Sequence, residues 1–194
     1  ASGAVYGLRL LEELLRDKAL EAHLVLSRAA QTILETEHGL RVDAEAFDPA
    51  ALKLPGAKRL ICHRNDDLAA PIASGSFRVD AMAVVPCSMG CVSAIAHGAS
   101  DDLIERAADV MLKERRTLIV VPREMPFSAV HLENLLALAR LGVTVMPACP
   151  GFYGKPRTVA EMVDFVVARV LDHLGVAHRL GPRWGAGGGT PAAQ

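Results

Sequence analysis

The sequence predicts an α/β fold in which a parallel β-sheet is covered by helices on both faces. Short apolar runs alternate with longer stretches of helical spacing along most of the chain, and this alternation is typical of strand–helix–strand units with right-handed crossovers. The composition agrees: 51% of the 194 residues are apolar but only 4% are aromatic, so Ala, Val and Leu fill the interior, as in sheets buried on both faces. Small polar residues follow several apolar runs, where open α/β sheets place their ligands.

The first helix is predicted over Val5–Lys18, because Leu8, Leu11 and Leu15 recur there at the spacing of one helix face. A doubly wound sheet normally has a central strand before this helix. We therefore expect a first strand to belong upstream of Ala1.

The remaining elements follow from apolar runs, caps and breakers. Prolines and glycines break the pattern between His38 and Pro55, and the tail from Gly185 onward has little that packs and is expected to be mobile. One domain over residues 1–184 is expected. Strands are predicted over Ala22–Leu26, Arg59–Cys62, Ala81–Val85, Thr117–Val121 and Val143–Pro147, and helices over Ala29–Glu37, Asp101–Arg115 (capped by Ser100), Ser128–Leu141 and Thr158–Leu174, with another helix after Ser88.

Composition argues against several classes of protein. The formal net charge is −1 with both signs interspersed, so neither nucleic acid nor a membrane surface is expected as a partner. No apolar run approaches the roughly 20 residues that cross a bilayer. The four cysteines are interpreted as reduced thiols of a cytoplasmic protein. A metal site at Cys87, Cys91 and His97 is disfavoured, because no fourth ligand has zinc-like spacing.

The most informative stretch is Val84–Cys91, where an apolar strand runs through Pro86 into small residues. Ser88 and Gly90 let a ligand approach the backbone, and the N–H groups of the next helix can hold an anion. Residues 1–7 resemble a second loop of this kind. Two such loops predict a nucleotide-like ligand across the sheet edge.

Other polar residues near strand ends allow two interpretations each. Ser2 and Ser27 either contact a ligand or cap a helix. Arg123 follows a strand, and its guanidinium can bind an anion through two parallel hydrogen bonds. Glu124 can exchange protons if burial raises its pKa. The alternative for both is a surface ion pair.

Four further residues are ambiguous from their positions alone. Lys113 ends a helix, where a solvated face is the simpler interpretation, and Glu37 also lies at a helix end. Tyr153 offers a hydroxyl in a loop. Arg169 lies on an otherwise apolar helix face and would be costly to bury without an anionic partner.

These segments together closely resemble the UbiX family of flavin prenyltransferases, and the likeness continues to Trp184. The family's Gly-[Ile/Met]-[Ser/Thr]-Gly before Ala1 is absent here, and His38–Asp67 supports no assignment. The matching segments are Ala1–Leu11, Ala73–Ser76, Val84–Cys91, Ile104–Arg116, Val121–Asn134, Pro150–Tyr153 and Val163–Asp172.

The resemblance implies a Rossmann-like, flavodoxin-like flavoprotein that needs no metal. The resemblance also implies the reaction: an enzyme of this family joins the dimethylallyl group of dimethylallyl phosphate to reduced FMN. The product, prenylated FMN, serves a UbiD-type decarboxylase. Family members assemble as homo-oligomers, typically dodecamers.

Site residues are carried over from the family position by position, and Lys113 thereby gains a functional interpretation. The resemblance implies FMN contacts at Ala1, Ser2, Ser27, Ser88, Met89, Gly90, Cys91 and Arg123. It implies prenyl-phosphate contacts at Lys113, Tyr153 and Arg169, with Trp184 near the prenyl pocket. Ser2, Glu37 and Glu124 match family residues that are implicated in the prenyl-transfer chemistry.

Two alternatives stay open at this point. An FMN-dependent cysteine decarboxylase is expected to carry an Asn-containing loop where this chain has Cys87–Cys91. A non-catalytic subunit that delivers FMN would not need cations beside the flavin.

Overall fold

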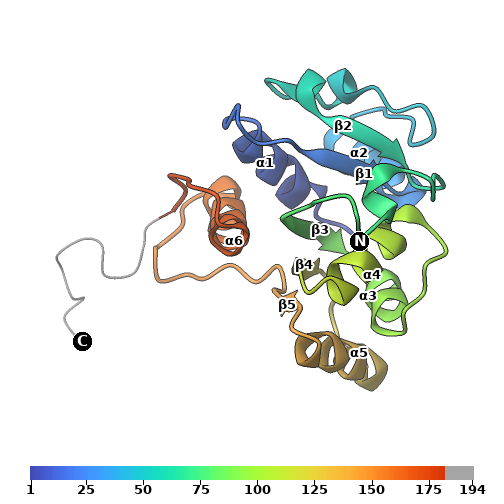
Figure 1. Ribbon diagram of the computed structural model, residues 1–194. Coiled ribbons are helices and arrows are strands. Elements are labelled where there is room, and N and C mark those ends of the chain that lie inside the picture. The colour runs from blue at the N-terminus through green and yellow to red at the C-terminus, as the bar shows by residue number, and fades with distance from the viewer. Residues whose placement is uncertain (182–194) are drawn as a thin grey trace.

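Five parallel strands form two sheets in the computed structural model, which describes residues 1–181. Trp184 and the expected mobile tail lie outside the described residues. In the first sheet β1 (His23–Leu26) pairs with β2 (Ile61–Arg64), with Val25 opposite His63. The second sheet has the order β3-β4-β5, and β1 and β3 are not paired with each other (Figure 1). Its strands are β3 (Ala81–Cys87), β4 (Thr117–Pro122) and β5 (Thr144–Val145).

Within residues 1–181, six α-helices and three short 3-10 helices precede, connect and follow the strands. Side-chain caps fix several helix starts: Ser27, Ser88, Asp102, Ser128 and Thr158 each accept a hydrogen bond from an amide in the first turn. The helices are α1 (Ala4–Leu14), α2 (Arg28–His38), α3 (Met89–Ala96), α4 (Leu103–Lys113), α5 (Ala129–Arg140) and α6 (Val159–Leu174), and the 3-10 helices are η1 (Pro49–Leu52), η2 (Ala57–Arg59) and η3 (Pro71–Ala73).

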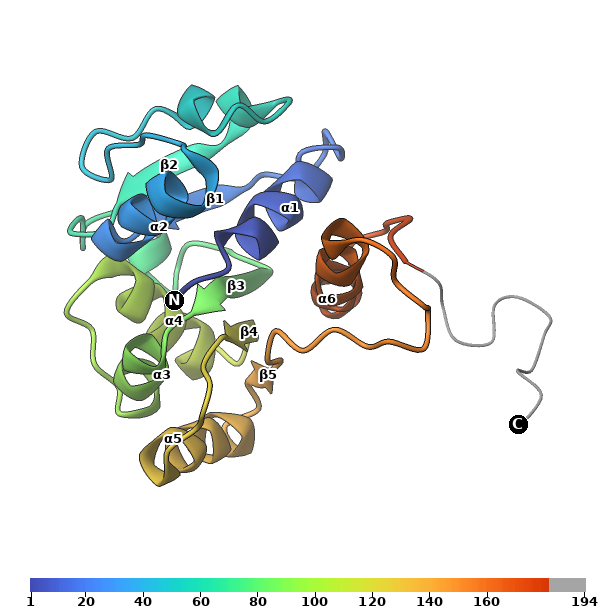
Figure 2. The same ribbon diagram turned by 180° about the vertical axis from the view of Figure 1, so that it is seen from behind.

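Strand β4 carries side chains into two separate hydrophobic cores. Leu118 and Val120 pack with residues of α3, α4 and α5, whereas Ile119 and Val121 pack with α1 and α6. Successive side chains of a strand point to opposite faces, so α3 and α4 cover one face of the sheet and α6 the other (Figures 1 and 2). The predicted parallel sheet with helices on both faces is confirmed.

Several predicted element boundaries were wrong. The first helix ends at Leu14 rather than Lys18, and β5 pairs over only two residues. Asp102, not Ser100, caps α4, because the Asn65 amide after β2 donates to the Asp102 carboxylate and holds it there. That contact joins segments far apart in sequence, so local patterns could not reveal it.

Helix α1 passes unusually close to β3 at Gly7. A Cβ at this position would lie 2.7 Å from the Val85 carbonyl oxygen, which is a backbone atom. Glycine therefore allows α1 to rest on the sheet, and this contact places the start of α1 near the end of β3.

We predict that Gly7→Ala lowers the free energy of unfolding. Overpacking costs about 1–3 kcal/mol and exceeds the roughly 0.5–1 kcal/mol by which alanine favours a helix. Gly90→Ala in α3 is the matched control, because its Cβ would meet only the Ser88 hydroxyl, at 3.8 Å. Urea unfolding should show a loss for Gly7→Ala and no loss for Gly90→Ala; equal effects would contradict the close contact.

Candidate functional site

The candidate site lies at the carboxyl edge of the strands, where three predicted residues follow three strands. Ser27 comes after β1, Ser88 after β3 and Arg123 after β4. Because the strands within each sheet are parallel, their carboxyl ends lie at the same edge. Ser27 and Ser88 also begin α2 and α3, so helix N-termini open at this edge.

Both serines act as helix caps and keep a donor for a ligand. The Ser27 hydroxyl accepts from the Ala30 amide, and the Ser88 hydroxyl accepts from the Cys91 amide, each at 3.2 Å. A hydroxyl that accepts still has its own hydrogen to donate. The two interpretations offered by the sequence, cap and ligand contact, are thus compatible.

Glu37 holds the N-terminus of α1. Its carboxylate accepts hydrogen bonds from the Gly3 amide at 3.1 Å and from the Ala4 amide at 3.0 Å. Burial by itself raises the pKa of Glu37, but the hydrogen bonds from the Ser2 side chain and from the Gly3 and Ala4 amides outweigh it and keep the pKa below its ordinary value of 4.5. Glu37 is therefore an anion at neutral pH.

Arg123 joins the same cluster from β4. Its Nε donates to the Ser2 carbonyl oxygen at 3.2 Å, and its backbone amide donates to the Cys87 carbonyl at 3.4 Å. The structure thus brings together Ser2, Glu37 and Arg123 from three distant parts of the chain. The Ser2 side chain and the amides of α1 are taken by Glu37, so the Arg123 guanidinium is the donor of this cluster that is suited to a further anion.

Tyr6 belongs to this neighbourhood but was missed in the sequence. Its ring would lie 3.2 Å from a Cβ at Gly3, so it packs against the start of α1. Burial raises the pKa of Tyr6, and the nearby Cys149 adds to the effect. An aromatic residue one turn into a helix gives no signal of its own.

The two cysteines that flank Ser88 interact with each other. The fully buried Cys87 thiol donates to the Cys91 sulfur, which raises the pKa of Cys87, with burial adding to it, and lowers the pKa of Cys91. Between them, a Cβ at Gly90 would meet only the Ser88 hydroxyl, at 3.8 Å. Gly90 is exposed, whereas Met89 is buried, and the use of this loop for a ligand stays a prediction.

Tyr153 and Arg169 lie on the side of the sheet covered by α6. The Tyr153 ring packs edge-on against Phe165 with ring centroids 5.6 Å apart, and Arg169 follows Phe165 by one helical turn. Arg169 avoids the cost of burial that its apolar helix face suggested: its side chain is 53% exposed and pairs with Asp172 at 2.7 Å. Only the packing of α6 could decide which side of the helix faces solvent.

Lys113 is separated from these two residues within one chain. It ends α4, on the opposite face of the sheet from α6 (Figure 2). It also precedes β4 and so lies toward the amino edge of the strands, whereas Arg123 follows β4. Its Nζ pairs with Glu114 at 2.6 Å, and both side chains crowd Gly75.

The segment around Gly75 is held by two arginines. Arg106 donates to the Ala73 carbonyl at 3.0 Å, and Arg116 donates to the Gly75 and Phe77 carbonyls at 2.6 and 2.8 Å. This fixes the backbone beside Lys113. The matching segment Ala73–Ser76 thus lies against Lys113, a neighbour that spacing alone did not suggest.

Glu124 stands apart from the Glu37 cluster. It is half-buried, directly after Arg123, and its Oε1 accepts from the Met125 amide at 3.1 Å. This contact orients the carboxylate at the end of β4.

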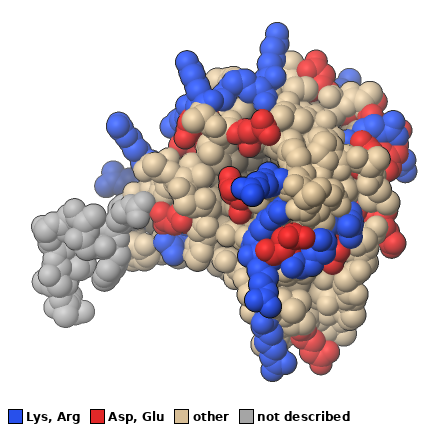
Figure 3. All heavy atoms as spheres, viewed as in Figure 1, with Lys and Arg blue, Asp and Glu red and all other residues tan. Residues whose placement is uncertain are grey.

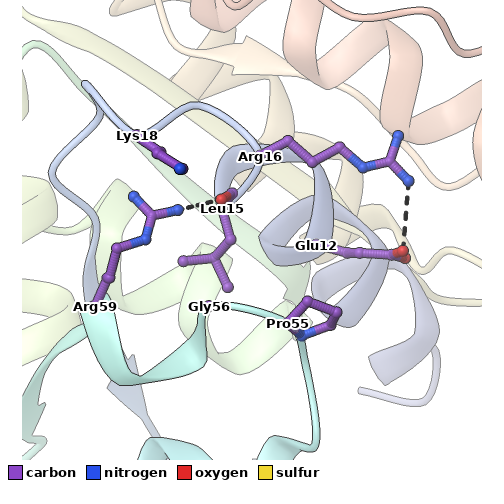
Figure 4. Close-up of a pocket in the computed structure, with 7 residues that line it drawn as sticks. All are labelled: Glu12, Leu15, Arg16, Lys18, Pro55, Gly56 and Arg59. Atoms are coloured by element: carbon purple, nitrogen blue, oxygen red, sulfur yellow. Dashed lines mark hydrogen bonds and ion pairs between the residues drawn. The ribbon is translucent and has the colours of Figure 1, made fainter.

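A separate pocket of about 340 Å³ lies at the far end of α1 (Figure 4). Arg59 donates to the Leu15 carbonyl there, and Arg16 pairs with Glu12 at 3.5 Å. Cations are favoured near the last carbonyls of a helix. These contacts explain the pocket's charges as a helix end, distant from the candidate site.

Among residues 1–181, no group of three or more His, Cys, Asp or Glu side chains is placed to hold a metal ion. Within the same residues, no helix has the length and apolar character needed to cross a bilayer.

We predict that Glu37→Gln lowers stability in a pH-dependent way. A charge at a helix N-terminus contributes about 0.3–1 kcal/mol, and Gln removes the charge while keeping an acceptor. Because the folded-state pKa lies below 4.5, the contribution is fully present above the unfolded-state pKa and is lost as pH falls through the folded-state value.

Urea unfolding of both proteins at neutral and stepwise lower pH measures this effect. The difference should shrink toward zero on acidification. Glu35→Gln on the same helix is the control, because its exposed ion pair with Arg41 contributes little. A difference that is independent of pH would show that the Glu37 charge does not support α1.

Comparison with known proteins identifies the family. The Flavoprotein family matches residues 1–171. The flavin prenyltransferase UbiX of Pseudomonas aeruginosa is 49% identical, over 95% of this chain and 90% of that protein.

Two solved structures share the fold at similar coverage. A dodecameric FMN-dependent UbiX-like decarboxylase from Escherichia coli O157:H7 is 45% identical with a TM-score of 0.85, over 95% of this chain and 94% of the other. AnUbiX (PadA1), solved with FMN and dimethylallyl pyrophosphate, is 38% identical with a TM-score of 0.79, over 94% of both chains. With its fold and these relatives taken together, the chain belongs to the UbiX family of flavin prenyltransferases.

Proposed function

We propose that this protein transfers the dimethylallyl group of dimethylallyl phosphate to reduced FMN and releases prenylated FMN. The observation that carries the proposal is the junction of Ser2, Glu37 and Arg123 at a sheet edge where helix N-termini open. A family of flavin prenyltransferases supplies the reaction class.

The residues at this edge fit FMN. The Ser27 and Ser88 hydroxyls and the Arg123 guanidinium are donors for the phosphate and for the polar edge of the flavin. The open backbone at Gly90 admits a flat ring. Reduced FMN supplies an electron-rich acceptor for the prenyl group. The FMN-contact set stays as predicted: Ala1, Ser2, Ser27, Ser88, Met89, Gly90, Cys91 and Arg123.

Cations replace a metal in stabilising the leaving phosphate. Cleavage of the allylic carbon–oxygen bond places negative charge on phosphate, and Lys113, Tyr153 and Arg169 would receive it by charge and hydrogen bonding. Arg169 is half exposed and Lys113 is nearly so, each held only by a neighbouring carboxylate that a phosphate dianion can displace.

Lys113 lies on the other face of the sheet from Arg169, so one chain does not unite the three residues. We propose that Lys113 of one copy completes the site of another. A homo-oligomer, which we propose to be a dodecamer, is then a requirement of the chemistry. The relative from E. coli O157:H7 is dodecameric.

The two glutamates have different tasks in this proposal. Glu37 is anionic and occupied by the Ser2 side chain and two amides, so with Ser2 it holds the loop in place. Glu124 is the candidate for moving the proton that the flavin ring loses as the second bond forms. Trp184, which follows the described residues, stays a prediction for the prenyl pocket.

The partners and location rest on the family resemblance. We propose a UbiD-type decarboxylase as the recipient of the product, and a cytoplasmic location consistent with four free cysteines.

One incubation tests the proposed function. The protein is incubated with reduced FMN and dimethylallyl phosphate, and the mass of the flavin is then measured by mass spectrometry. A gain of one prenyl unit supports the proposal. An unchanged flavin mass would leave the cysteine decarboxylase or the non-catalytic subunit.

We predict that Arg169→Ala lowers kcat by about 10²–10³-fold, as deletion of one oxyanion donor does. Flavin affinity and thermal stability should change little, because Arg169 is exposed. Lys58→Ala is the control, since this exposed lysine lies in η2, outside the site. Full prenylation by purified Arg169→Ala would remove Arg169 from the phosphate site.

We predict that Gly75→Ala raises KM for dimethylallyl phosphate while kcat and the melting temperature stay near wild type. Its Cβ would press on the Glu114 carboxylate and lie 2.7 Å from Lys113 Nζ, and both flexible tips can move away without disturbing the fold. An increase in KM of about tenfold corresponds to ~1.4 kcal/mol. Lys113→Ala marks the largest effect expected; an unchanged KM in Gly75→Ala would show that Gly75 does not position the lysine.

A further inference from the structure

Exposed apolar side chains gather on and beside α5. We call the patch formed by Met125, Phe127, Val130, Leu132, Leu136 and Leu141 the α5 patch. It holds six of the twelve large apolar residues that are exposed within residues 1–181. In Figure 3 the lower right of the molecule is largely tan, bordered by a column of Lys and Arg side chains and by an acidic group at its lower edge. Such a concentration marks an interaction surface rather than scattered exposure.

Only one side of α5 is used inside the chain. Asn134 and Leu138 are buried, and Leu138 packs in the core that also contains α3. On the opposite side Leu132, Leu136 and Arg140 recur at helical spacing and are exposed. A helix with apolar residues on both sides is typically buried on both sides. The exposed side of α5 with Leu132, Leu136 and Arg140, here called the outer stripe, is covered by no other element of the described chain.

The charges on this stripe are self-complementary. Glu133 and Arg140 are exposed, seven residues apart on one side of α5, and neither takes part in an ion pair within the described chain. In an antiparallel pair of α5 helices related by a two-fold axis near Leu136, Glu133 of one copy faces Arg140 of the other, twice.

We propose that α5 packs antiparallel against α5 of a second copy, with Leu136 near the two-fold axis and reciprocal Glu133–Arg140 ion pairs at its flanks. An isologous contact requires one patch that complements itself, and the opposite charges of Glu133 and Arg140 meet this requirement. A partner of different sequence would not require opposite charges placed symmetrically about Leu136. The inference concerns assembly and does not depend on the proposed reaction.

Charge reversal tests the pairing. Arg140→Glu places two glutamates opposite each other, and Glu133→Arg places two arginines opposite each other. Each should reduce the assembly mass measured by sedimentation velocity. The double variant Glu133→Arg/Arg140→Glu restores opposite charges and should restore the wild-type mass. Lys58→Glu carries the same charge change as Arg140→Glu at a distant exposed position and should leave the mass unchanged.

Cross-linking provides a second readout that preserves the fold. Leu136→Cys in a Cys149→Ser background should give a covalent dimer with a short bis-maleimide, whereas Cys149→Ser alone should not. Wild-type mass in both single charge variants, failure of the double variant to restore the mass, or no dimer from Leu136→Cys would each overturn the pairing. An unchanged flavin mass after incubation of the wild-type protein would instead count against the proposed function and would leave the pairing unaffected.

Discussion

The burial of β4 on both faces is the constraint on which the rest of the molecule depends. Leu118 and Val120 belong to one core, and Ile119 and Val121 to the other. Because a strand alternates its side chains between faces, the helices must divide between two layers. That division places α4 and α6 on opposite sides of the sheet, with Lys113 on one and Arg169 on the other.

The carboxyl edge of the strands is where the N-termini of α2 and α3 lie. Helix N-termini carry unsatisfied amides and partial positive charge, and the chain satisfies them with side chains that retain capacity for a ligand. Ser27 and Ser88 accept from amides yet keep a hydroxyl hydrogen, and Glu37 neutralises the start of α1. The edge is thus stable by itself and still rich in donors.

The proposed chemistry and the proposed assembly support each other physically. Phosphate stabilisation without a metal needs several cations in one place, but cations repel one another and are costly to bury together. Here Lys113 and Arg169 each have a neighbouring carboxylate, Glu114 or Asp172. Distributing them over separate copies lets each chain fold without concentrating the charge.

The sequence by itself determined the fold class, the order of strands and helices, the small-residue loop at Val84–Cys91 and the family. These follow from local periodicity and from ordered motifs that a single strand or turn can carry. Only the tertiary structure decided that Ser2, Glu37 and Arg123 meet, that Asp102 caps α4, that Arg169 is exposed, and that Gly75 lies against Lys113. Each of these depends on contacts between distant segments, whose distances and orientations are set by packing and leave no trace in the local pattern.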